Sequence, residues 1–209
     1  MENKIANILL DCKAVKVNPS DPFTYASGIR SPIYCDNREL LGFFDARNTI
    51  IESFLEVIPN DVDIIVGVAT AGIPWGAIIA HMLNKPFSYV RAKAKDHGVG
   101  KQVEGADITG KKLAVIEDLI STGGSSLEAV KALYDNGAAK ADVYAIFTYE
   151  FANIDDAFKN ANSSLKTLSK FSVLIENLIA KNVLTKEQGE IVSEWNKSPK
   201  EWYDNHFTS

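Results

Sequence analysis

Apolar residues follow two patterns along the middle of the chain, short continuous runs and helical spacings, and the two patterns alternate. The continuous runs, rich in β-branched residues, predict strands at residues 63–67, 87–90, 113–116 and 141–147. Helical spacing predicts helices at residues 40–58, 75–83 and 127–134. Strands without polar alternation are typical of a parallel sheet that is covered on both faces. The pattern therefore predicts an α/β fold with a mostly parallel sheet flanked by helices.

The first forty residues carry a different pattern. Ile5, Ile8 and Leu9 lie at helical spacing and predict an amphipathic opening helix over residues 3–15. Prolines, glycine and short aromatic pieces in residues 18–38 are instead typical of a turn-rich hairpin. We expect this N-terminal segment to form a small hood over the carboxyl edge of the sheet.

Helical spacing returns beyond residue 150. It predicts short helices near residues 151–158, 171–179 and 188–195, with an edge strand at 165–168. Trp202 and Tyr203 near the C-terminus either pack on the body of the protein or take part in dimerisation. We expect a single domain over residues 1–209, divided into a hood at about 1–40, a core at about 41–150 and C-terminal helices at about 151–209.

Composition and charge narrow the functional classes. Hydrophobic residues make up 46% of the chain, and the net charge of -5, without a basic stripe, argues against a nucleic-acid partner. Cys12 and Cys35 are too few for a disulfide scaffold and have no metal-ligand partners at usual spacings, so we expect small packing residues. Without a recognisable signal peptide or membrane-spanning run, the sequence predicts a cytoplasmic protein with no membrane partner.

Candidate chemistry concentrates in residues 113–126, which have the sequence LAVIEDLISTGGSS. The carboxylates of Glu117 and Asp118 follow the apolar run, and adjacent carboxylates at a strand end can accept hydrogen bonds from the vicinal hydroxyls of a ribose. Small residues then lead into a helix, whose first N–H groups and dipole favour an anion such as phosphate. The stretch therefore predicts a site for a phosphorylated sugar.

The turn inside this stretch has the composition of a phosphate-binding loop. Gly123 and Gly124 allow the backbone to approach a phosphate closely, and the hydroxyls of Ser121, Thr122 and Ser125 add donors. A P-loop would need a lysine before its last Ser/Thr, and a dinucleotide-binding turn would need G-x-G-x-x-G; neither is present. A purely structural turn explains the glycines but not the two carboxylates.

An acidic pair followed by a Thr/Gly-rich turn resembles the signature of the type I phosphoribosyltransferases. The resemblance implies that family's fold and 5-phospho-α-D-ribose 1-diphosphate as a substrate. A second small-residue turn at residues 69–72, after the strand at 63–67, resembles the pyrophosphate loop of the family. That likeness also implies a strained or cis peptide near Ala69-Thr70, whereas a tight structural connection is the alternative interpretation of this turn.

Residues 91–101, RAKAKDHGVGK, hold four fixed positive charges and a histidine without apolar periodicity. Such runs are commonly solvated faces. This one resembles the catalytic loop R-x-x-x-K-x-H-G of orotate phosphoribosyltransferases. The resemblance implies that Arg91, Lys95 and His97 contact the pyrophosphate, and that the Arg91–Lys101 loop is shared between the subunits of a homodimer.

Residues 18–38 resemble the N-terminal segment F-T-x-x-S-G-x-x-S-P-x-Y-x-D-x-R of the same family, which forms part of a hood over the base. The resemblance implies orotate as the acceptor, bound by Ser121, Tyr34 and Arg38. Some members bind the base carboxylate with an arginine after the strand that corresponds to residues 141–147, and this chain has none there. Arg30, Arg38 or backbone N–H groups are left for that role.

The resemblance thus implies transfer of a phosphoribosyl group to N1 of orotate, giving orotidine 5'-phosphate and pyrophosphate in pyrimidine synthesis. Its implied catalytic residues are Lys95, His97 and Asp118. Its implied residues for the sugar diphosphate are Thr70, Ala71, Arg91, Lys95, His97, Glu117, Asp118, Leu119, Ile120, Ser121, Thr122, Gly123, Gly124 and Ser125. Mg2+ is the implied cofactor, held mainly through substrate and water and not by direct protein ligands.

Two other functions stay open on the sequence. A phosphoribosyltransferase for a purine or for uracil would keep the central motif without needing the segment at residues 18–38. A non-catalytic sensor of the sugar diphosphate would be expected to lose the catalytic loop and to gain a DNA-binding segment.

Overall fold

A six-stranded sheet forms the centre of the molecule in the computed structural model, which describes residues 1–25, 28–92 and 102–207. Its strands are β5 (Ile64–Val68), β6 (Phe87–Val90), β7 (Val103–Gly105), β8 (Lys112–Ile120), β9 (Lys140–Thr148) and β10 (Leu165–Lys170). They lie in the order β10-β9-β8-β5-β6-β7, and only β7 is antiparallel to its neighbour. The predicted α/β fold with a mostly parallel sheet is confirmed.

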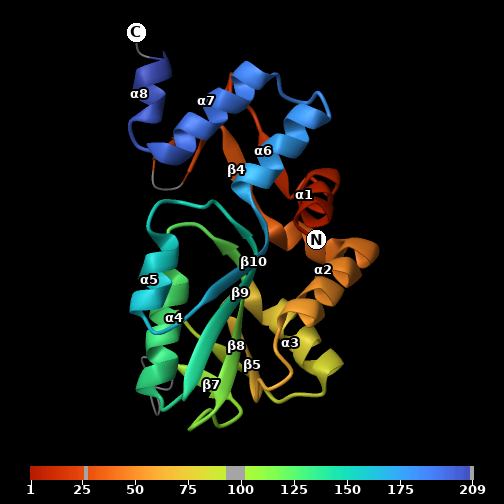
Figure 1. Cartoon of the computed structure of the whole chain (residues 1–209), viewed down its shortest axis with the longest axis vertical. Helices are drawn as coiled ribbons and strands as arrows, with labels where there is room; N and C mark the ends of the chain where they lie inside the picture. Colours follow the sequence, from red (N-terminus) through yellow and green to blue (C-terminus); the bar gives the residue numbers. More distant parts are fainter. Residues whose placement is uncertain (26–27, 93–101, 208–209) are drawn as a thin grey trace.

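Helices cover both faces of this sheet. One face carries α1 (Glu2–Asp11), α2 (Phe44–Val57) and α3 (Gly72–Leu83), and the other carries α4 (Gly124–Asp135) and α5 (Ile154–Asn160) (Figure 1). Because side chains alternate across a strand, β8 serves two cores. Ala114 and Ile116 belong to the core on the first face, whereas Leu113 and Val115 belong to the core on the second.

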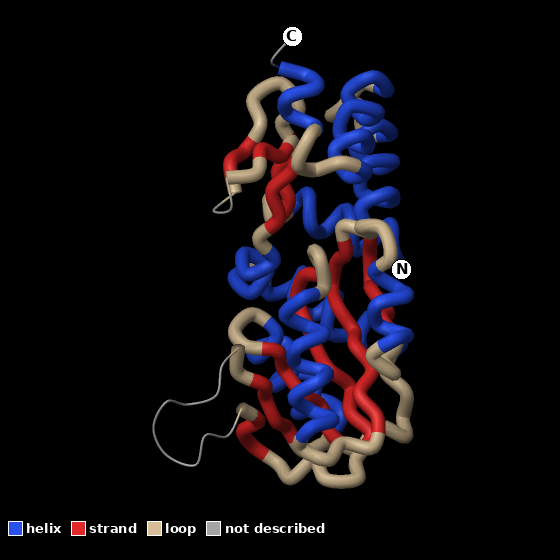
Figure 2. The backbone as a smooth tube through the Cα atoms, turned by 90° about the vertical axis from the view of Figure 1, so that its left-hand side faces the viewer, coloured by secondary structure: helices blue, strands red, loops and turns tan. Residues whose placement is uncertain are grey.

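The hood above the sheet is built from both ends of the chain (Figures 1 and 2). Its N-terminal part contains the strand pairs β1 (Val15–Val17) with β4 (Ile33–Cys35) and β2 (Phe23–Thr24) with β3 (Arg30–Ser31), followed by the 3-10 helix η1 (Asn37–Gly42). Its C-terminal part contains α6 (Phe171–Ala180), α7 (Lys186–Lys197) and α8 (Trp202–Phe207). Helix α7 begins with a capping box in which Thr185 and Gln188 exchange hydrogen bonds.

Buried aromatic side chains join the two parts of the hood. The Trp195 indole N–H donates to the Arg30 carbonyl oxygen at 3.1 Å, across 165 residues of sequence. The Arg30 guanidinium lies 4.4 Å from the centre of the Tyr203 ring. Trp202 is only 1% exposed, so packing on the body of the protein, one of the two predicted uses of these aromatics, is confirmed for this residue.

Three element predictions were wrong in detail. The single helix expected at residues 40–58 is divided, because Phe43 has extended backbone between η1 and α2. The short strand β7 was not predicted, since three residues give no readable periodicity. The strand expected at 113–116 runs on to Ile120, so that the acidic pair lies inside β8 and does not follow it.

The neighbouring parallel strands β5 and β8, at the centre of the sheet, do not end at the same level. The pairing of β5 with β8 stops at Gly67 and Ile116, whereas β8 continues to Ile120 beside β9. Helix α3 starts against this continuation, and a β-carbon built on Gly72 would overlap the carbonyl oxygen of Ile116. The turn that leads into α3 therefore lies directly beside the acidic part of β8.

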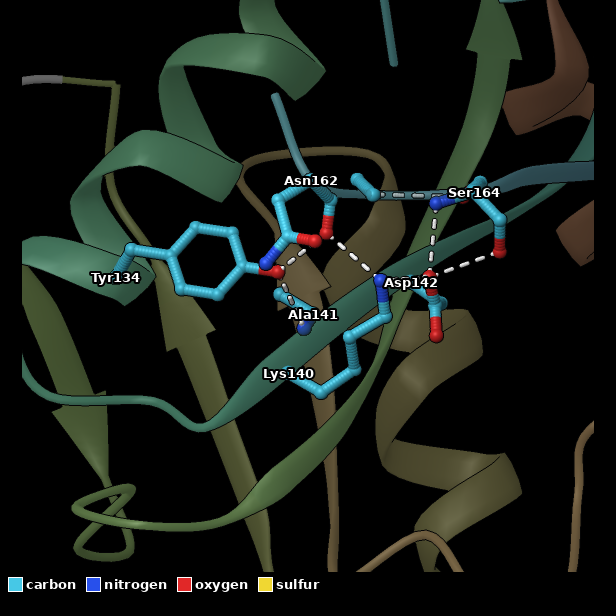
Figure 3. A network of polar contacts seen from close by, with 7 residues as sticks. Tyr134, Lys140, Ala141, Asp142, Asn162 and Ser164 are labelled. Atoms are coloured by element: carbon cyan, nitrogen blue, oxygen red, sulfur yellow. Dashed lines mark hydrogen bonds and ion pairs between the residues drawn. The ribbon is translucent and has the colours of Figure 1, made fainter. Parts of the chain in front are cut away.

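A network of polar contacts lies at the opposite end of the strands, where β9 begins (Figure 3). The Tyr134 hydroxyl and the Lys140 ammonium both donate to the Asn162 carbonyl oxygen, at 2.6 and 2.7 Å. Ser164 donates to the Asp142 carboxylate through its N–H and its hydroxyl, each at 2.8 Å. This network joins α4 and the loop before β10 to the start of β9, at the end of the sheet away from the hood.

We expect Gly72→Ala to lower the free energy of unfolding by about 1–3 kcal/mol, because the added methyl group overlaps the backbone of β8 and forces one of the two elements to shift. Urea denaturation measures the change. The matched control is Gly42→Ala, whose methyl group meets no atom within 4 Å and is expected to be neutral or slightly stabilising. Equal stabilities of Gly72→Ala and the wild type would contradict this account of the contact.

Candidate active site

The acidic pair lies where β8 has passed the end of β5. Glu117 is 6% exposed, and each of its carboxylate oxygens accepts a hydrogen bond. Oε1 accepts from the Asp118 N–H at 3.0 Å, and Oε2 accepts from the Ser126 hydroxyl at 3.2 Å. The start of α4 therefore holds Glu117 in place, while Asp118 is the more exposed member of the pair.

Burial changes the protonation of these two carboxyls. Loss of hydration raises the pKa of Glu117, and the neighbouring Asp118 charge raises it further, to about 8. Burial also raises the pKa of Asp118, although hydrogen bonds and the Arg38 charge act in the opposite direction. Two carboxyls this close titrate as a pair, and near neutral pH the pair retains a proton. A ligand that donates hydroxyl groups to them would stabilise their ionised form.

The turn from Ser121 to Gly124 presents the start of α4. Its N-cap is Gly123, whose φ of 77° lies in the left-handed region, and an added β-carbon would come within 2.6 Å of the Ile154 side chain. Glycine has no side chain that could satisfy the first N–H groups of the helix. Thr122, Gly124 and Ser125 are exposed. The helix start is therefore open to an anion, and the binding of a phosphate there stays a prediction.

Leu119 and Ile120, also predicted at this site, face the two cores. Ile120 is fully buried, and its carbonyl oxygen accepts from the Tyr149 N–H at 3.0 Å. Leu119 packs against the core on the other face. Any contact of Ile120 with a ligand would therefore use its backbone, whereas the side chain of Leu119 is partly exposed.

The second turn meets the acidic pair. A cis peptide joins Ala69 to Thr70, which confirms the prediction for this bond. Thr70 is exposed and Ala71 partly exposed, and a β-carbon on Gly72 would lie 3.4 Å from the Glu117 α-carbon. The structure thus brings the two predicted small-residue turns to either side of the carboxylates.

Arg91 follows β6 at the same edge of the sheet. Its N–H donates to the Gln102 carbonyl oxygen at 2.9 Å, and its guanidinium lies 3.8 Å from the Glu104 carboxylate. Lys95 and His97, the other two residues predicted to contact the pyrophosphate, lie outside the described residues. Their roles stay predictions.

Of the three residues predicted to bind the base, Ser121 lines a cavity beside the turn that leads into α4. This cavity has a volume of about 720 Å³, and Tyr25 and Trp195 are also among the residues that line it. Tyr34 and Arg38 are absent from the described lining residues. Arg38 is 67% exposed and binds the Asp36 carboxylate through two hydrogen bonds of 2.6 Å, so a base carboxylate at Arg38 would have to compete with Asp36.

Two hydrogen bonds between the hood and the sheet were not predicted from the sequence. The Asn37 side-chain N–H donates to the Asp118 carbonyl oxygen at 2.6 Å, and the hydroxyls of Tyr25 and Tyr149 lie 3.2 Å apart. Their partners stand 81 and 124 residues apart in the sequence. Local spacing could not reveal them, although Asn37 lies within the segment that resembles the family.

The carboxylates of Glu117 and Asp118 suit a hard cation such as Mg2+ whose other ligands are oxygens of substrate and water. Carboxylate oxygens are the protein ligands that Mg2+ prefers, and Glu117 and Asp118 supply them beside the two turns. Within residues 1–25, 28–92 and 102–207, no group of three or more His, Cys, Asp or Glu side chains is arranged to hold a metal. The same part of the chain contains no helix with the length and apolar character needed to cross a bilayer.

Comparison with known proteins agrees with this geometry. A family model described as "Phosphoribosyl transferase domain" matches residues 39–171, more than half of the chain. The chain is 47% identical over 205 residues to the orotate phosphoribosyltransferase of Listeria monocytogenes, with 97% of this chain and 98% of the relative aligned. It is 49% identical over 201 residues to that of Lactococcus lactis, with 95% and 96% aligned.

A solved structure is similar over most of its length. The orotate phosphoribosyltransferase of Aeropyrum pernix superposes with a TM-score of 0.74 at 29% sequence identity, over 83% of this chain and 97% of that one.

We expect Glu117→Gln to change the pH dependence of stability. The raised pKa of Glu117 means that the folded protein binds a proton which the unfolded chain has released, so the contribution of Glu117 to wild-type stability falls as pH rises from about 4.5 to about 8. Urea denaturation across this range should show the difference between wild type and variant changing by up to ~1.4 kcal/mol per pH unit.

Glu128→Gln, which alters an exposed glutamate of α4, is the matched control. This exposed position lies away from the buried carboxyl pair, so its difference in stability from the wild type serves as the baseline for the comparison. Parallel curves for the wild type and Glu117→Gln would show that Glu117 is ionised throughout.

Proposed function

The chain belongs to the orotate phosphoribosyltransferase family, and from this premise we propose that it transfers the phosphoribosyl group of 5-phospho-α-D-ribose 1-diphosphate to N1 of orotate. The products are orotidine 5'-phosphate and pyrophosphate, a step of pyrimidine synthesis. The observation that carries the proposal is the open start of α4 directly beside a buried carboxylate pair. The near full-length similarity to orotate phosphoribosyltransferases supports the choice of base.

The substrate would lie across the carboxyl edge of the sheet. Its 5'-phosphate binds the turn at Ser121–Ser125, where unsatisfied N–H groups and hydroxyls converge. The ribose hydroxyls donate to Asp118 and Glu117. The pyrophosphate meets the turn at Ala69–Gly72, which the close approach of α3 to β8 holds beside the carboxylates.

The reaction exchanges one bond at C1 of the ribose for another. The electron pair on orotate N1 forms the new bond as N1 gives up its proton to water or to the departing pyrophosphate, while the C1–oxygen bond breaks and its electrons leave with pyrophosphate. Positive charge develops on the ribose, and negative charge grows on the leaving group. Asp118 and Glu117 stabilise the first, and Arg91, Lys95 and His97 stabilise the second. His97 either donates a proton to the pyrophosphate or only a hydrogen bond.

Mg2+ belongs to the same proposal. When bound, the metal ion would neutralise charge on the leaving group, and the carboxylate of Asp118 would hold it through its water ligands. The same residue thus orients the sugar and its counter-ion.

Two further features follow from the family resemblance. The Arg91–Lys101 loop would complete the site of a neighbouring subunit in a homodimer. A cytoplasmic location suits the proposed substrate, because a multiply charged sugar diphosphate does not cross an apolar bilayer unaided.

The choice of base is tested by incubating the protein with the sugar diphosphate, Mg2+ and one base at a time, and by measuring the pyrophosphate released. We expect release with orotate and none with adenine, guanine, hypoxanthine or uracil above a reaction without base. Release with a purine or with uracil alone would assign another transferase of the fold. Binding without release for any base would assign a sensor.

The proposed loop contacts are tested by Lys95→Ala. Removing one preorganised cation from the leaving group is worth ~3 kcal/mol, so we expect turnover to fall about a hundredfold while the thermal unfolding temperature is unchanged. Lys131→Ala, an exposed lysine paired with Asp135 on α4, is the control and should keep full turnover. A near-normal rate for Lys95→Ala would remove this lysine from the mechanism.

A further inference from the structure

A fully buried amide connects the hood to the acidic strand. Asn37, the first residue of η1, is 0% exposed. Its side-chain N–H donates to the Asp118 carbonyl oxygen at 2.6 Å. This contact joins the N-terminal part of the hood to the backbone of the residue that carries the more exposed carboxylate of the pair.

The Asp118 carbonyl lies where the sheet no longer provides regular partners. Strand β5 pairs with β8 only as far as Ile116, and Asp118 is skipped in the pairing of β8 with β9, which includes Glu117 and Leu119. A buried carbonyl without a partner would cost free energy comparable to a lost hydrogen bond. Asn37 supplies the partner that a neighbouring strand would otherwise give.

The amide is itself held in one orientation. The Cys35 thiol donates to the Asn37 side-chain oxygen at 3.2 Å, which directs the NH2 group toward Asp118. Burial raises the pKa of the Cys35 thiol, so it stays protonated and able to donate. The Asp36 carboxylate accepts from the Arg38 N–H at 3.2 Å and fixes the start of η1. Cys35 and Asp36, the two residues before Asn37, therefore keep the amide in place.

The same backbone unit connects to the second carboxylate. The Asp118 N–H donates to Glu117, and Glu117 accepts from Ser126 at the start of α4. A continuous path of hydrogen bonds thus runs from the hood through Asp118 and Glu117 to the proposed phosphate-binding turn. A shift of η1 would move the carbonyl of Asp118 and with it the carboxylate pair.

We propose that Asn37 is a positioning residue for the transfer reaction, holding the Asp118 carboxylate in place for the ribose and coupling the hood to the sugar site. This inference rests on the proposed function. Asn37 acts through Asp118 and not on the substrate. Without the amide, the aromatic contacts between hood and sheet still stabilise the fold, but the acidic pair can move.

The first test is Asn37→Ala, with Asn136→Ala as the matched control. Asn136 also donates from its side chain to a backbone carbonyl, that of Ala132 at 2.8 Å, but at the far end of α4. We expect Asn37→Ala to weaken binding of the sugar diphosphate with Mg2+ in calorimetry, and to lower kcat/KM with orotate about 10- to 100-fold. Asn136→Ala should leave both values within about twofold.

A double-mutant cycle separates positioning from a merely structural role. If Asn37 acts through Asp118, Asn37→Ala should cost less than about threefold when Asp118 is already Asn, because the group it positions has lost its charge. If the amide only stabilises the hood, its loss costs the same fold-change in both backgrounds. Full additivity would overturn the proposal, as would normal binding and kcat/KM in Asn37→Ala.

Asn37→Asp gives a signature that simple loss of stability cannot produce. The ionised side chain cannot donate to the Asp118 carbonyl, but the protonated side chain can. At this fully buried position, loss of hydration and the nearby Asp36 and Asp118 charges raise the pKa of the introduced carboxyl. The kcat/KM ratio of wild type to Asn37→Asp should therefore shrink as pH falls from about 8.5 to about 5.5, whereas the ratio for Asn37→Ala should stay constant. The charged and titratable groups around this position, common to all variants, are Cys35, Asp36, Arg38, Glu117 and Asp118.

Failure of the proposed function is distinguishable from failure of this inference. If the wild type binds the sugar diphosphate but transfers it to no base, calorimetry still compares Asn37→Ala with Asn136→Ala. Equal affinities of these two variants would overturn the role of Asn37 whatever base the protein uses. A pH-independent defect in Asn37→Asp would overturn the hydrogen-bond explanation.

Discussion

The site depends on the difference in length between two neighbouring strands. Because β8 continues for four residues beyond its last pairing with β5, from Ile116 to Ile120, its backbone there is regular on one side and lacks a strand partner on the other. The start of α3 and the amide of Asn37 approach this segment. A carboxylate pair placed here is rigid, since it belongs to a strand. It also borders the carboxyl end of the sheet, where the substrate is proposed to bind. Few other positions in a parallel sheet offer both properties.

Rigidity at this position costs stability. Glu117 is buried with its pKa raised, and Asp118 adds a second carboxyl beside it, so the ionised pair is less favourable in the folded protein than in water. The hood compensates through the aromatic cluster of Tyr25, Tyr149 and Trp195, whose rings lie 5.6 to 6.4 Å apart where they pack. Functional sites commonly retain such unfavourable groups while the surrounding packing stabilises them.

The sequence predicted those parts of the protein that depend on neighbours along the chain. Alternating apolar runs predicted the sheet and its helices, and the small residues before a helical pattern, such as Gly123 and Gly124, predicted a turn at the start of a helix as a candidate anion site. The extent of β8 was not predictable, because polar residues such as Glu117 end an apolar run without ending a strand. The hydrogen bond from Asn37 was not predictable either, since its partner is distant in sequence and a buried asparagine has no periodic signature.

This difference separates the two halves of the candidate site. The sugar-phosphate half is local, a strand, a turn and a helix start within about fifteen residues, and it is readable in many sequences of the same fold. The proposed base half would involve the hood, and the hood needs both ends of the chain, as the bond between Trp195 and Arg30 shows. Under this proposal, substitutions in the C-terminal helices would change base binding without touching the turn at Ser121–Ser125. Asn37 is where the two halves meet, because it belongs to the hood by sequence and to the acidic strand by its hydrogen bond.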